Sequence, residues 1–168
     1  TMTRKKMTGE TKFTDRWNEL EEECNKYKKF LNLNLNQNDE VEQYLNLDRD
    51  TMKAMDIEEL AIAIATLSRH GIFIQQQYNY HARIVNWINA NLDMIAVREI
   101  DQYKDSYLPF NAKRLLVINN DDIAIKFLAK SVEHKGFMDD LEKISEKIQY
   151  YSESLSGLKF EKIRRLKQ

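Results

Sequence analysis

The sequence predicts an all-α protein built around a long antiparallel helical hairpin, with an additional N-terminal helix. The chain holds 4 glycines and 1 proline in 168 residues, about 3%, where about 12% is usual. Sandwiches, barrels and doubly wound sheets need frequent tight turns, which this composition cannot supply. Apolar residues follow heptad spacing over three segments, and Pro109 separates the two longest of them.

The first heptad segment predicts a helix from about residue 13 to 31, with its apolar residues on one narrow seam. In 32–38, asparagines alternate with leucines, so we expect a linker or a short extended strand. A short acidic helix over 39–47 and a connector over 48–55 follow. The seam of the first helix consists of Phe13, Trp17, Leu20, Cys24, Tyr27 and Leu31.

The second segment predicts a helix of about 70 Å from 57 to 102, opened by Asp56 as N-cap with Glu59 as its reciprocal acid. Such a helix needs a partner along its whole length. Gly71 leaves a gap on its seam where a partner backbone or a large side chain could approach. The seam consists of Leu60, Ile64, Leu67, Gly71, Ile74, Tyr78, His81, Val85, Ile88, Leu92 and Ile95.

Pro109 ends the second helix and predicts a reversal of the chain. A short helix through 114–118 comes next, and the polar run 119–122 supplies N-cap side chains for a third long helix. The second and third helices are similar in length, so we expect an antiparallel hairpin. The third seam consists of Ile123, Phe127, Lys130, His134, Phe137, Leu141, Ile144, Ile148, Tyr151, Leu155 and Leu158.

We expect two regions, a basic arm with helix and linker over 1–38 and a hairpin domain with a basic C-terminal helix over 39–168. With 42% apolar and 32% charged residues, the core is lean for a compact globule. The sequence therefore predicts a coiled-coil-like bundle that associates with further copies of itself, a homo-oligomer.

Charge is distributed unevenly along the chain although its net value is −1. Both ends are basic, and residues 39–59 are mostly acidic. Copies of such a chain can join head to tail through these opposite charges. Alternatively, the acidic region of one chain can bind its own basic ends until a polyanion competes for them. The alternative is that these residues are ordinary solvated helix faces.

The remaining composition argues against catalysis and against a membrane protein. Cys24 has no second cysteine for an internal disulfide and falls on an apolar seam, so we expect a buried thiol. No long apolar run or signal-like start is present, which predicts a cytoplasmic protein. His70, His81 and His134 lack metal-ligand spacing, so we expect no metal, no cofactor and no enzyme activity, with His81 and His134 in the core.

One stretch, 69–87, combines amides, cations and aromatic side chains in the way that single-stranded nucleic acid is bound. The basic C-terminal segment could neutralise phosphates, lie on an anionic membrane, or dock on an acidic neighbour. Its scarcity of aromatic anchors disfavours the membrane. The candidate nucleic-acid-binding residues are Arg69, Tyr80, Arg83, Trp87, Arg114, Lys159, Lys162, Arg164, Arg165 and Lys167.

The layout over residues 57–168 resembles the small helical recombination mediators of the UvsY type from tailed phages. The resemblance rests on the long helix with Ala82–Trp87, the break at Tyr107–Phe110, the start at Asn119–Asp121 and the basic end. It implies a ring-like homo-oligomer that binds single-stranded DNA, contacts the single-strand-binding protein and helps to load a RecA-type recombinase in the host cytoplasm. The N-terminal heptad and the Asn/Leu linker have no counterpart in that family.

The leading expectation is thus a non-enzymatic single-stranded-DNA-binding accessory of recombination and DNA repair. The alternative is a coiled-coil interaction module, an adaptor, scaffold or inhibitor, without nucleic-acid binding.

Overall fold

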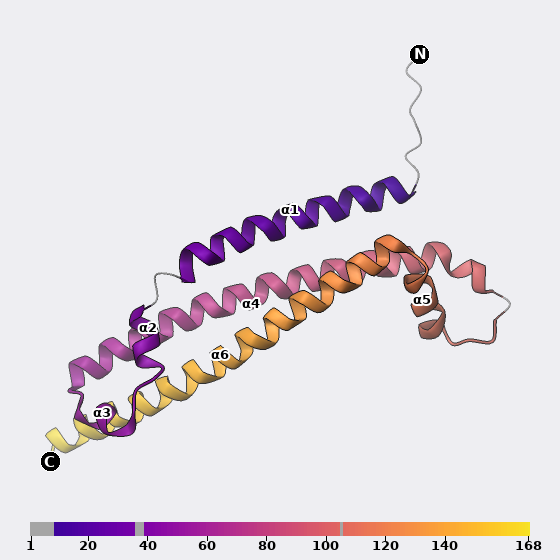
Figure 1. The fold of residues 1–168 in the computed structure, drawn as a ribbon. Helices are drawn as coiled ribbons and strands as arrows, with labels where there is room; N and C mark the ends of the chain where they lie inside the picture. Colours follow the sequence, from indigo (N-terminus) through magenta and orange to yellow (C-terminus); the bar gives the residue numbers. More distant parts are fainter. Residues whose placement is uncertain (1–8, 36–38, 105) are drawn as a thin grey trace. The chain divides into compact units, whose positions relative to one another are not determined.

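A computed structural model describes residues 9–35, 39–104 and 106–168; within them, 9–12, 27–35 and 39 are described as backbone only. The described residues form helices joined by short turns and loops and include no β-strand, so the all-α prediction is confirmed. Figure 1 shows the element order. The helices are α1 (Gly9–Leu35), α2 (Asp39–Tyr44), α3 (Arg49–Ala54), α4 (Ile57–Glu99), the 3-10 helix η1 (Ile100–Tyr103), α5 (Phe110–Asn119) and α6 (Asp122–Leu166).

Two compact units, each discontinuous in sequence, make up the chain. Unit 1 comprises residues 1–34 and 84–134, and unit 2 comprises residues 35–83 and 135–168. The long helices α4 and α6 contribute to both units. The expected division of the chain after residue 38 stays a prediction.

In unit 1, α4 and α6 run antiparallel, because Trp87 packs against Phe127 while Arg98, further along α4, reaches back to Asp121 at the start of α6. The first helix, α1, lies against both. The ring of Trp17 meets Phe127 edge-on at 5.6 Å between centroids. The buried apolar residues of unit 1 include Phe13, Leu20, Cys24, Ile84, Val85, Ile88, Leu92, Ile95, Ala96, Val117, Ile118, Ala124 and Phe127.

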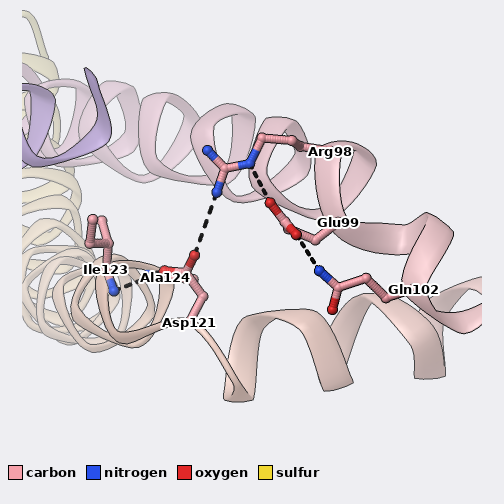
Figure 2. A network of polar contacts seen from close by, with 6 residues as sticks. All are labelled: Arg98, Glu99, Gln102, Asp121, Ile123 and Ala124. Carbon is pink, nitrogen blue, oxygen red and sulfur yellow. Dashed lines mark hydrogen bonds and ion pairs between the residues drawn. The ribbon is translucent and has the colours of Figure 1, made fainter. Parts of the chain in front are cut away.

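Polar contacts fix the end of α4 against the start of α6 in unit 1 (Figure 2). The Arg98 guanidinium donates to Glu99 at 2.6 Å and lies 3.9 Å from Asp121. The other oxygen of Asp121 accepts from the backbone amides of Ile123 and Ala124 at 2.9 and 2.8 Å. Asp121 is therefore the N-cap of α6, as the polar run predicted.

In unit 2, the packing of α4 on α6 is again antiparallel, since Gly71 faces Ile148 while His81 meets Phe137. Two short helices, α2 and α3, add Val41 and Met52 to the same core. The predicted capping pair opens α4: Glu59 N–H donates to the Asp56 carboxylate and Asp56 N–H to the Glu59 carboxylate, both at 2.8 Å. The buried core of unit 2 is Val41, Met52, Leu60, Ala63, Leu67, Ile74, Ile148 and Leu155.

Two local predictions are wrong. Residues 32–35 are helical, as the last turn of α1; asparagine costs a helix only tenths of a kcal/mol, and extending an existing helix needs no new nucleus. Residues 49–54 form α3 instead of a connector. Asp48 supports this helix by accepting from the amides of Asp50 and Thr51 at 2.9 and 2.8 Å. Residues 36–38, and the side chains of Tyr27 and Leu31, lie outside what is described.

Other boundaries differ by a few residues. The acidic helix α2 stops at Tyr44, and α4 gives way to 3-10 geometry at Ile100. Pro109 is extended (φ −63°, ψ 157°) and is the N-cap of α5, which begins at Phe110, ahead of the predicted 114. The basic C-terminal helix is the end of α6 itself.

Candidate nucleic-acid interface

Between Glu59 and Asp93, α4 carries no acidic side chain over 33 residues, 60–92, and the only Lys or Arg residues of this segment are Arg69 and Arg83. Both arginines are exposed. The charge that this helix segment itself contributes is therefore positive throughout. This segment is therefore the part of α4 best suited to a polyanion.

Within unit 2, the arginines belong to one solvent-facing line of α4, which we call the α4 ridge and define as Arg69, Ile72, Gln76, Tyr80 and Arg83. Its members are separated by three or four residues, so they follow one another along a single helix face. Arg69 and Arg83 are 14 residues apart, which places their backbones about 21 Å apart along the helix axis. That length matches several nucleotides of an extended strand.

The ridge offers contacts of three kinds. Arg69, Gln76 and Arg83 are exposed, and Ile72 is 63% exposed. Tyr80 is half-buried, and its ring lies edge-on to the buried His81 at 5.6 Å. Because this contact holds the tyrosine ring in place, a nucleobase could stack on it with little loss of side-chain entropy.

Two of the predicted residues lie in unit 1 and have structural contacts. The ring of Trp87 is 37% exposed and packs against Phe127 with centroids 5.8 Å apart. Nε of Arg114 donates to the Asp93 carboxylate at 2.7 Å. Trp87 is thus part of the packing around Phe127, and the charge of Arg114 is balanced by Asp93.

The basic residues of the C-terminal segment differ in their contacts and in their exposure to solvent. Lys162 donates to the backbone carbonyl of Lys53 at 2.8 Å, in the last turn of α3, and Arg165 pairs with Glu161. Arg164 and Lys167 are exposed and three residues apart, so they share another face of the helix. Lys159 is half-buried. Arg164, Arg165 and Lys167 are thus the exposed cations of this segment.

Sequence reasoning missed Ile72 and Gln76 as members of the ridge. The signal was their spacing from Arg69 by three and seven residues, which places them on the face of the arginine. The prediction noted the amides of 69–87 but chose its candidate residues from the aromatic and basic side chains alone.

The histidines and the cysteine are placed as expected for packing residues. His81 and His134 are each 2% exposed, and the Cys24 sulfur lies 3.2 Å from Nε2 of His134. His70 stacks on Phe73 at 5.9 Å. Its partial burial lowers the pKa of the imidazole below the usual 6.5, because the charged form loses hydration.

Over the described ranges, His, Cys, Asp and Glu side chains do not gather in groups of three or more that could hold a metal ion. A search of the same ranges finds no helix with the length and apolar character needed to cross a membrane.

No protein family, curated protein or solved structure matches the chain.

Proposed function

We propose that this chain is a non-enzymatic accessory protein that binds single-stranded DNA along the α4 ridge. The observation that supports this proposal most strongly is that Arg69 and Arg83 are exposed on one face of a helix segment that has no carboxylate. Phosphates would pair with the two guanidinium groups, and a base would lie against Tyr80. Contacts of this kind bind strands of any sequence.

The resemblance of the layout to phage recombination mediators supports a more specific form of this function. In that form, the protein is a homo-oligomer that holds single-stranded DNA and helps to load a RecA-type recombinase in the presence of single-strand-binding protein. The basic, exposed Arg164 and Lys167 would then add phosphate contacts at the end of α6.

The test is fluorescence anisotropy of a labelled single-stranded oligonucleotide at about 50 and about 300 mM salt, with a duplex of equal length as comparison. We expect binding at low salt that weakens steeply as salt rises and changes little between mixed sequences of equal length. Absence of binding at both salt concentrations would refute the proposal.

A second candidate function, a helix-interaction module, is favoured by the outer face of α6 in unit 1. Ile125, Leu128 and Val132 are exposed by 44%, 38% and 63% and are spaced by three and four residues. Ala124 and Phe127, on the adjoining face of the same turns, are buried. A helix that is apolar on both faces usually packs against a neighbour on both. This candidate predicts a complex with another helical protein and no affinity for DNA.

A further inference from the structure

A hollow of about 530 Å³ lies in unit 2 where α4 begins and α6 ends. Residues from the two ends of this unit's helices line it although they are about a hundred positions apart in the chain. The lining residues are Asp56, Ile57, Glu58, Lys162, Arg165 and Leu166.

Opposite charges occupy the two sides of this hollow. Asp56 and Glu58 come from the start of α4, and Lys162 and Arg165 come from the last turns of α6. Each side contributes one apolar residue as well, and Leu166 is 78% exposed. The lining therefore has two negative charges, two positive charges and an apolar part open to solvent.

Short contacts hold Asp56, Lys162 and Arg165 in position. One Asp56 oxygen accepts from Glu59 N–H at 2.8 Å, and Lys162 donates to the Lys53 carbonyl. Arg165 pairs with Glu161 on its own helix. A carboxylate has two oxygens, an ammonium three donors and a guanidinium five, so each group keeps capacity for a further partner.

We propose that the hollow binds the same hollow of a second copy of this chain, related by a two-fold axis. An isologous interface brings one patch against itself, so residue i meets j and residue j meets i. Here that exchange places Glu58 of each copy near Arg165 of the other, around a centre of isoleucine and leucine side chains. A partner with charge of a single sign would be repelled by one side of the hollow.

The size of the patch limits the affinity expected for the dimer. A standard interface involves about 20 to 30 residues on each side, and this patch has six lining residues. We therefore expect a weak dimer, with a dissociation constant on the order of 10 µM, that weakens as salt rises. The inference concerns self-association and does not depend on DNA binding, which a separate anisotropy titration measures.

Charge reversal combined with mixing tests the proposal by sedimentation velocity at about 100 µM and low salt. Most of the wild type should be dimeric at this concentration, and the variants Glu58→Lys and Arg165→Glu should each raise the dissociation constant at least about tenfold, so that about half of each variant or less is dimeric. Mixing the two variants should restore a dimer, because each reversed residue then meets its opposite on the other copy. Contacts within one chain cannot produce that restoration.

Glu153→Lys is the matched control, since Glu153 is exposed on α6 and does not line the hollow. It should leave the dimer unchanged. Circular dichroism checks that each variant is helical. If a charge-reversal variant does not fold, the neutral variants Glu58→Gln and Arg165→Gln take its place, and each should weaken the dimer about threefold. A monomeric wild type, reversal variants that dimerise like the wild type, or a mixture that dimerises no more than the separate variants would each overturn the proposal.

Discussion

The Cγ2 methyl of Ile148 on α6 lies 3.6 Å from the point that a Cβ atom on Gly71 of α4 would occupy. The gap expected at Gly71 is thus faced by a large side chain of the same chain. A distance of 3.6 Å is an ordinary van der Waals contact. The structure therefore leaves room for a methyl group at a position where the sequence has none.

Gly71→Ala should stabilise the protein by about 1 kcal/mol, because alanine loses less conformational entropy in a helix interior than glycine does. Urea unfolding followed by circular dichroism measures the change. Gly157→Ala is the comparison, since apart from its chain neighbours and the local helix backbone no atom lies within 4 Å of its added Cβ. A loss of stability at Gly71 together with a gain at Gly157 would contradict the described contact with Ile148.

Phe127→Ala should destabilise unit 1 by about 3 to 5 kcal/mol, the usual cost of removing a buried phenylalanine ring. Phe127 is fully buried, and its ring meets both Trp17 and Trp87 edge-on. Guanidinium unfolding monitored by tryptophan fluorescence tests this. Phe160→Ala is the control, because Phe160 is 72% exposed and its loss should cost little. Equal effects of the two substitutions would contradict the packing around Phe127.

Cys24 should react with a thiol reagent at least about tenfold more slowly in the native protein than in denaturant. The thiol is 2% exposed on α1 and lies beside His134 of α6. Access to it requires α1 to separate from α6 within unit 1. The rate of reaction with a maleimide, followed by mass spectrometry, measures this separation. Native labelling as fast as that of the unfolded chain would show that α1 does not stay docked.

Stability should fall as the pH drops from about 7 to about 5, in part through His70. The pKa of His70 is lowered by burial, so below its usual 6.5 the unfolded chain binds a proton that the folded chain resists. The stability from this group is present above that pH and is lost as the pH falls. His70→Gln should flatten the dependence of the melting temperature on pH. An identical dependence in wild type and variant would contradict the assignment.

The structure could be predicted correctly from the sequence where it depends on the periodicity of apolar residues or on residues close together in the chain. The seams placed Leu60, Leu67 and Phe127 in the core, and the capping pair of Asp56 and Glu59 formed as predicted. The short helix α3 and the last turn of α1 were missed because propensity over a few residues is a weak guide.

Tertiary partners could not be predicted from local pattern. The Lys162 contact with Lys53 joins residues 109 positions apart, and Arg114 pairs with Asp93 across 21 positions. Trp87 has the spacing of an exposed stacking residue, and only its contact with Phe127 shows that it packs. Three of the five residues of the α4 ridge were predicted, since Arg69, Tyr80 and Arg83 were singled out while Ile72 and Gln76 were not.

The DNA affinity of the double variant Arg69→Gln/Arg83→Gln tests the central claim most directly. Its matched control is Lys143→Gln/Lys147→Gln, which removes the same charge from exposed positions of α6 that lie among acidic residues. The account predicts that the ridge variant loses at least about tenfold in affinity for single-stranded DNA. Its slope of log affinity against log salt should also fall by about 1.4, which corresponds to two phosphate contacts, while the control stays close to wild type. Equal losses in the two variants, or none in the ridge variant, would contradict binding along the α4 ridge.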